Sequence, residues 1–170
     1  MILGRRTTEY GRHDMISQTV EYALRAAVTL AQHDPSACTA QTISEITQVP
    51  RPYLSKLLQN LTRMGLIRSK RGPTGGFVLV TPADRVAIWN VIQAVEPIQR
   101  IHECPLGVKG HNTLCPLHRR LDEAVEMVEQ AFQETTLADL LNEPGSVTPL
   151  CALNPIVQIT TVKPAKKNEE

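Results

Sequence analysis

The chain has 170 residues, of which 42% are hydrophobic, and its formal net charge is +1 at pH 7. This length and apolar content suffice for one domain with a hydrophobic core plus an appendage. No apolar run approaches the ~20 residues of a membrane-spanning helix and the N-terminus lacks the pattern of a secretory signal, so we expect a cytoplasmic protein with no membrane partner.

Residues 1–14 are polar and have no periodic apolar pattern, so we expect an extension without regular structure. A first helix is predicted from Ser17 to His33, because Ser17 can cap its start and Asp34-Pro35 stops it. Its apolar residues recur at three- and four-residue steps, which is typical of a helix with one buried face. They are Val20, Ala23, Leu24, Ala27, Val28 and Ala31.

Two further helices follow with a tight connection between them. Thr39 or Thr42 can cap the first of the two, and Val49-Pro50 ends it. The next helix starts near Pro52 and is terminated by Gly65, and its buried stripe consists of Leu54, Leu57, Leu58 and Leu61. Its opposite face carries Arg51, Tyr53, Lys56 and Arg63, so the pair matches a helix-turn-helix with a basic reading helix.

The charge distribution supports that interpretation. Residues 46–83 contain no Asp or Glu, whereas six cations lie among them: Arg51, Lys56, Arg63, Arg68, Lys70 and Arg71. Residues 121–143 show the reverse pattern, with seven acids and no Lys or Arg. A nearly neutral average therefore conceals a basic segment suited to a polyanion.

The string "GPTGGFVLV", residues 72–80, contains the second of two short β-prone runs, residues 66–69 and 77–80, which a turn rich in Gly and Pro separates. A nucleotide-binding loop would need a strand, a glycine turn and then a helix, and the Walker lysine and hydroxyl are missing. We therefore predict a β-hairpin that acts as a wing, with Arg71 at its base and Thr74 and Gly75 at a slim tip that enters a narrow groove. A solvated surface hairpin is the alternative interpretation.

The remaining pattern predicts two more helices. Asp84 is expected to cap a helix that runs to about Glu96 and ends at Pro97. A long helix is expected over residues 116–142, and its apolar seam of Leu117, Leu121, Val125, Val128 and Phe132 is followed by Leu137, Leu140 and Leu141. An apolar stripe on a helix outside the compact region predicts dimerisation. Beyond Pro144 we expect a mostly disordered tail.

The strings "VEYALRAAVTLA", "VPRPYLSKLLQNLTRMGLIRSKRGPTGGFVL" and "VAIWNVIQAVEP" resemble, in order and spacing, the Rrf2 (Rrf-two) family of bacterial transcription regulators, which includes IscR-like and NsrR-like proteins. The resemblance covers about Met15 to Asn142. It implies a winged helix-turn-helix homodimer on a dyad-symmetric DNA operator, with the reading helix in the major groove and the wing in the minor groove. It also places Arg51, Ser55 and Lys56 at the exposed start of the reading helix and Arg71 on the wing. Tyr53 matches a family tyrosine, which either contacts phosphate or seats the helix.

The four cysteines are poor disulfide candidates in a reducing compartment. Cys104 and Cys115 are separated by ten residues, and His118 follows three positions later, a donor set that suits iron-sulfur or zinc. The cluster-binding relatives place three cysteines in this loop, and the middle one has no counterpart here. The resemblance also implies a carboxylate from the partner's first helix, for which Glu21 is the match.

We therefore hypothesise a two-iron two-sulfur cluster on Cys104 and Cys115 with one or two of His118, His111 and Glu21. An apo regulator with a packed loop or a redox-sensitive thiol pair, and a zinc site, remain open alternatives. Cys38 and Cys151 have no metal-ligand company and are expected to be small hydrophobes or bystanders.

The expected fold is mainly α with a small β-hairpin wing: a winged helix-turn-helix domain plus a long C-terminal dimerisation helix. Its divisions are an extension (1–14), the DNA-binding domain (15–97), a cysteine-containing sensor loop (98–115), the dimerisation helix (116–143) and a tail (144–170). The predicted function is a DNA-binding transcription regulator, expected to be a repressor that senses redox, nitric oxide or iron-sulfur status. A winged-helix interaction module is the alternative, and the sequence lacks the nucleophile turn or paired carboxylates of an enzyme.

Overall fold

The computed structural model describes residues 16–104 and 113–144. Its elements, in chain order, are α1 (Gln18–His33), α2 (Ala40–Thr47), α3 (Arg51–Arg63), β1 (Ile67–Lys70), β2 (Gly76–Leu79), the 3-10 turn η1 (Ala83–Arg85), α4 (Ile88–Val95), α5 (Pro116–Glu134) and α6 (Leu137–Asn142). These elements confirm the predicted fold class. None of the described helices has the length and apolar content to cross a bilayer. The predicted extension, His111 in the loop and the tail with Cys151 lie outside the described residues.

Helix α1 lies at the centre of the fold and contacts α2, α3, α4, α6 and β2. It begins where Ser17 caps it by accepting a hydrogen bond from the Val20 backbone amide, as predicted. The capping residue of α2 is Thr39, which settles the choice between the two threonines. Helix α3 starts at Arg51 with a proline in its first turn and is followed by Gly65 at φ +73°.

The reading helix buries the stripe that its sequence predicts. Leu54, Leu57, Leu58 and Leu61 are almost completely inaccessible and join the core with α1 and Ile43 of α2. Burying side chains of this size stabilises the fold by roughly 1.5–3 kcal/mol each. The leucine stripe therefore fixes which face of α3 is presented to solvent.

The hairpin pairs Ile67 with Leu79 and Lys70 with Gly76, so each strand lies within one residue of its predicted position. A backbone bridge attaches it to the segment before α2: the Cys38 amide donates to the Phe77 carbonyl at 3.0 Å, and the Phe77 amide donates to the Cys38 carbonyl at 2.8 Å. Cys38 is buried, as expected of a small hydrophobe, and burial raises the pKa of its thiol. The hairpin is thus anchored to the rest of the fold through β2.

Two predicted helix boundaries are wrong, and one pair of backbone hydrogen bonds explains both. Asp84 does not cap α4, because residues 83–85 form a 3-10 turn and α4 starts only at Ile88, after Ala87. The predicted helix over residues 116–142 is two helices, α5 and α6, separated by Thr135 and Thr136. The two irregular points pair with each other: the Ile88 amide donates to the Thr135 carbonyl and the Leu137 amide to the Val86 carbonyl, each at 2.9 Å.

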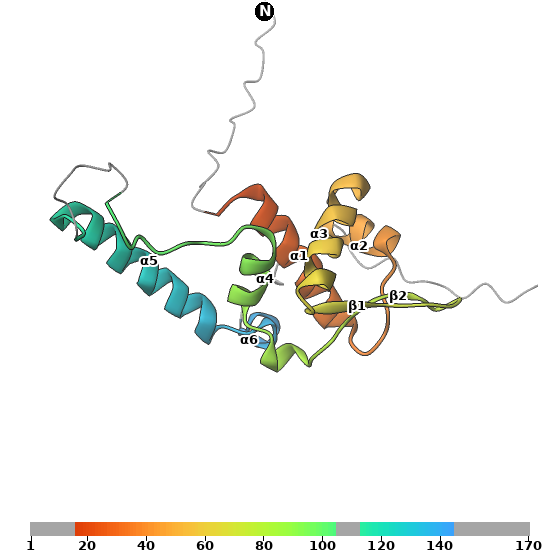
Figure 1. The fold of residues 1–170 in the computed structure, drawn as a ribbon. Coiled ribbons are helices and arrows are strands. Elements are labelled where there is room, and N and C mark those ends of the chain that lie inside the picture. The colour runs from red at the N-terminus through yellow and green to blue at the C-terminus, as the bar shows by residue number, and fades with distance from the viewer. Residues whose placement is uncertain (1–15, 105–112, 145–170) are drawn as a thin grey trace, which may run out of the picture.

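The break lets α6 fold back onto the first half of the protein. Thr136 caps α6 together with Asp139, and Leu137 is completely buried against the core. Helix α5 differs, since none of its residues is buried. Figure 1 shows α5 extending away on one side, while the hairpin projects on the other side, near α2 and α3.

Candidate functional site

The reading helix and the hairpin present a surface of positive charge. The basic surface consists of Arg51, Lys56, Arg63, Arg68, Lys70 and Arg71, all of which are exposed. Within the described ranges, none of these six forms an ion pair, whereas the cations Arg25, Arg100, Arg119 and Arg120 all do. Unpaired cations on adjacent elements are available to phosphates without first breaking an internal salt bridge.

The start of α3 presents the predicted contact residues. Arg51, Ser55 and Lys56 are exposed, and the Ser55 hydroxyl donates to the Arg51 carbonyl at 2.9 Å. Its oxygen keeps lone pairs that can accept from a base edge or a bound water. The three side chains therefore lie on the solvent face that the buried leucines leave outward.

Gln59 is a residue of this surface that the sequence patterns do not single out. It is exposed on α3, four residues after Ser55 and three after Lys56, so helical spacing puts it on the same face. A glutamine amide can bond an adenine edge through two hydrogen bonds. This spacing could have identified Gln59 from the sequence, but a search for charged residues passes over a glutamine.

Tyr53 has a structural role that favours the seating alternative. Its hydroxyl shares a hydrogen bond with Thr19, and its ring packs edge-on against Tyr22 at 5.7 Å between centroids. Both partners lie on α1. With 39% of the residue still exposed, Tyr53 positions the start of α3 on α1 and keeps one edge at the surface.

The hairpin tip is compact, and its geometry requires glycine at position 75. The Gly75 amide donates to the Gly72 carbonyl at 2.9 Å, and a Cβ on Gly75 would lie 2.5 Å from the Lys70 carbonyl oxygen. Arg71 and Thr74 are exposed beside this turn. Gly75 therefore closes the turn, which lets its neighbours project.

Two cysteines and a histidine meet at the start of α5. The Nδ1 atom of His118 lies 3.2 Å from the Cys115 sulfur and 3.8 Å from the Cys104 sulfur. Glu21 is not with them: it lies on α1 and forms an ion pair with Arg25. Among the residues that the structure describes, no group of three or more His, Cys, Asp or Glu side chains is arranged to hold a metal ion.

The donor chemistry of this cysteine site nevertheless fits iron or zinc. Two thiols and an imidazole are ligands that both metals accept, but an iron-sulfur cluster or a closed zinc site needs a fourth donor. The described part of the chain brings two sulfur atoms near one imidazole nitrogen. It supplies no fourth, so the side chains are gathered without forming a complete ligand cage.

An arginine-carboxylate clamp holds the segment before Cys104 against α5. Arg100 donates to both carboxylate oxygens of Asp122, at 2.7 and 2.6 Å, and to Glu126 at 3.2 Å. The Ile101 amide adds a bond to Asp122 at 2.8 Å. Because Asp122 lies one helical turn after His118, the clamp fixes the approach of Cys104 to the cysteine site.

This architecture is a winged helix-turn-helix with a projecting helix, and comparison with known proteins gives the family. Residues 16–143 match the Rrf2 family, described as iron-dependent transcriptional regulators. A protein of Aquifex aeolicus (strain VF5), assigned as an HTH-type transcriptional regulator, is 30% identical over 132 residues, which are 75% of this chain and 92% of that protein.

Solved structures agree. The structure of CymR, the global cysteine regulator of B. subtilis, has a TM-score of 0.62 and 27% identity, and the match covers 74% of this chain and 94% of that one. The T. potens IscR structure has a TM-score of 0.63 at 24% identity, covering 74% and 85% of the two chains, which is a likeness of fold.

The chain belongs to the Rrf2 family of transcriptional regulators. It is accordingly a DNA-binding regulator with a winged helix and not an enzyme, as its sequence predicted.

Proposed function

We propose that this regulator represses transcription as a homodimer bound across a dyad-symmetric operator. In this proposal α3 enters the major groove and the hairpin enters the adjacent minor groove of each half-site. The observation that carries it is the basic surface: six exposed cations with no acidic residue in the same stretch and no internal ion pair among the described residues. A regulator of chromosomal DNA would act in the cytoplasm.

The contacts are expected to divide between base reading and phosphate binding. Arg51, Ser55, Lys56 and Gln59 are the candidates for base edges, since they occupy the outward face of α3. Arg63, Arg68 and Lys70 are better suited to phosphates along the backbone. Arg71, with Thr74 and Gly75, is the candidate for the minor groove, whose negative potential attracts arginine.

The apolar face of α5 supports the homodimer. Leu117 and Leu121 are 64% and 47% exposed, and Met127 is exposed as well. Helix α5 has 19 residues and is about 28 Å long, and none of them is fully buried in the described structure. Phe132, at the far end of its apolar stripe, packs against the core, whereas Leu117 and Leu121 at the start of the stripe are available to a second copy. Two copies joined in this way would carry two basic surfaces.

Salt-dependent gel-shift titration tests the DNA proposal. We expect Arg71→Ala to weaken binding, and to lower the slope of log affinity against log salt by about 0.9 for each phosphate that is no longer neutralised. Arg119→Ala is the matched control, because it removes the same charge from an exposed position of α5. Unchanged affinity of Arg71→Ala for both selected operator fragments and random DNA would remove the hairpin from the mechanism.

The cysteine site supports a second proposal, that the regulator senses redox, nitric oxide or iron status. Cys104, Cys115 and His118 would hold the group, with Glu21 of a second copy as a candidate fourth donor. A bound two-iron two-sulfur cluster would supply one-electron redox chemistry. Two other states of the same residues compete with the cluster: a bound zinc ion, or a redox-sensitive pair of thiols without metal.

Anaerobic purification with metal analysis distinguishes these forms. A cluster predicts visible absorption and iron that are lost in Cys104→Ala and retained in Cys151→Ser, which changes none of Cys104, Cys115 and His118. Colourless protein with stoichiometric zinc would replace the cluster by a zinc site. A wild-type protein free of both metals would leave the apo regulator.

A further inference from the structure

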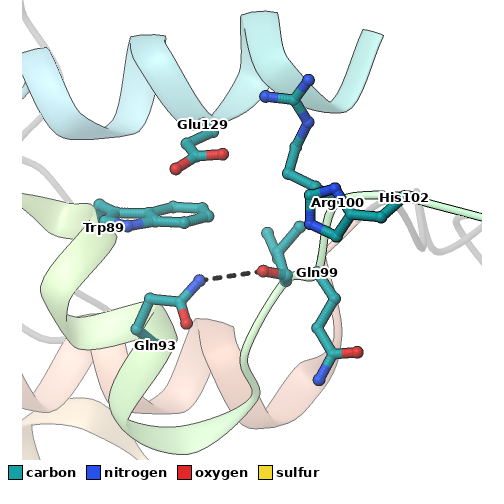
Figure 2. Close-up of a pocket in the computed structure, with 7 residues that line it drawn as sticks. Trp89, Gln93, Gln99, Arg100, His102 and Glu129 are labelled. Carbon is teal, nitrogen blue, oxygen red and sulfur yellow. Dashed lines mark hydrogen bonds between the residues drawn. The ribbon is translucent and has the colours of Figure 1, made fainter. Parts of the chain in front are cut away.

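A pocket of about 470 Å³ lies between α4, the segment that follows it and α5. Figure 2 shows Trp89 and Gln93 from α4, Gln99, Arg100 and His102 from the segment, and Glu129 from α5 around it. Its volume falls in the range of small-molecule sites in proteins. The cysteine site and the basic surface use none of these residues.

The pocket lining carries one carboxylate, that of Glu129, and one guanidinium, that of Arg100. Arg100 is engaged by Asp122 through two hydrogen bonds and by Glu126 through a third. Asp122 and Glu126 do not line the pocket but pair with its guanidinium, so Glu129 is the one lining charge that forms no ion pair among the described residues. Because its guanidinium already faces the two paired carboxylates, Arg100 is poorly available to an anionic ligand, whereas a cation would gain from the uncompensated charge of Glu129.

Trp89 provides the second attraction for a cation. Figure 2 shows its indole ring between the carboxylate of Glu129 on the α5 side and Gln93 on the other side. The face of an indole ring carries partial negative charge and attracts cations, most strongly among the aromatic side chains. The Gln93 side-chain amide nitrogen donates to the Ile98 carbonyl at 3.1 Å, and this hydrogen bond fixes the orientation of the side chain.

We propose that this pocket binds a small organic cation, with the ammonium or guanidinium group between the Trp89 ring and the Glu129 carboxylate. Such a group would be attracted electrostatically by the π-face and by the carboxylate together. A neutral molecule of the same shape lacks this attraction, and an anionic one is repelled. The site remains accessible in the proposed dimer, because Glu129 lies roughly 100° around α5 from Leu117 and Leu121. It is also remote from the basic surface.

The fluorescence of Trp89 gives a direct test, because it is the only tryptophan in the chain. Choline is the probe, and the control is its neutral isostere, in which a quaternary carbon replaces the nitrogen. We expect a saturable change in Trp89 fluorescence with choline, and binding of the isostere that is about tenfold weaker. Equal responses to the two molecules, or none to choline, would overturn the proposal.

Glu129→Gln tests the carboxylate while keeping the shape of the side chain. We expect about a tenfold loss of choline affinity, with unchanged helix content by circular dichroism. Glu134→Gln is the matched control, since that carboxylate lies on α5 outside the pocket and accepts a bond from Gln130. Undiminished binding by Glu129→Gln would contradict the site. The assay contains no DNA, so its result is independent of the proposed operator binding.

Discussion

Asp122 connects two parts of the protein through a single carboxylate. It accepts two hydrogen bonds from Arg100 and one from the Ile101 amide. The hydrogen bonds from Arg100 are the main reason why the pKa of Asp122 falls from 3.8 to about 2, against the opposing effect of burial. The same pairing raises the pKa of the Arg100 guanidinium above its ordinary value.

This lowered pKa predicts a specific acid sensitivity. The clamp stabilises the folded protein fully above the unfolded value of 3.8, and this contribution is lost as the pH falls through about 2. Asp122→Asn cannot make the charged pair, so its melting temperature should be lower at neutral pH and should decline less between about pH 4 and pH 2. Thermal melts over that range, with Glu134→Gln as control, measure the difference. Parallel curves for wild type and Asp122→Asn would exclude the clamp as a stabilising element.

At the scale of elements, the hairpin is held by close backbone contact with the segment before α2. Gly76 makes this possible: a Cβ there would lie 2.4 Å from the Cys38 carbonyl oxygen and 2.9 Å from the Thr39 amide nitrogen. Its φ of +149° is also unfavourable for other residues. Since the obstructing atoms are backbone, a side chain at this position must displace the hairpin or the segment.

Gly76→Ala should therefore cost more than an ordinary glycine replacement. We expect destabilisation of about 3 kcal/mol or more, from overpacking together with backbone strain. Gly65→Ala is the matched control, because Gly65 also has a positive φ, +73°, but no atom within 4 Å of its hypothetical Cβ. Its cost should be about 1–2 kcal/mol. Urea unfolding followed by circular dichroism compares the two, and equal losses of stability would show that the contact with Cys38 relaxes freely.

At the scale of the whole molecule, the two ends of the structure differ in how far they bury their apolar side chains. The half around α1 buries its own core, including Leu137 of α6. Helix α5 extends from that core, against which its Phe132 packs, and keeps Leu117 and Leu121 exposed. In the proposed dimer, operator affinity should depend on this helix even though it carries none of the basic surface, because joining two copies would make binding to the second half-site intramolecular.

The double variant Leu117→Glu with Leu121→Glu should separate the subunits. Placing like charges at the exposed start of the apolar stripe opposes its burial, so we expect a monomer by analytical ultracentrifugation and a loss of operator affinity of about 100-fold or more. Gln130→Glu adds a charge at an exposed position away from the stripe and should remain dimeric. A monomeric wild type, or a double variant that still dimerises, would exclude this face as the interface.

Local chemistry alone determined much of this protein. The cap at Ser17, the leucine stripe of α3 and the turn residues of the hairpin act within a few residues, so their elements were predicted closely. The exposure of Arg51, Lys56 and Arg63 followed from the same logic, because burying the leucines on one face of α3 turns the rest of the helix outward. Gln59 shares that face but lacks the charge that would have marked it.

Only the tertiary structure decided the features that join distant segments. Helical periodicity runs through Thr135 without interruption and Asp84 is a residue type that caps helices, yet α5 ends and α4 starts late. The reason is that backbone hydrogen bonds across the fold join Ile88 to Thr135 and Leu137 to Val86. The clamp between Arg100 and Asp122 and the pocket beside Trp89 likewise bring together residues that are more than twenty positions apart. Sequence spacing reports which residues share a helix face, whereas contacts between elements depend on how the whole chain packs.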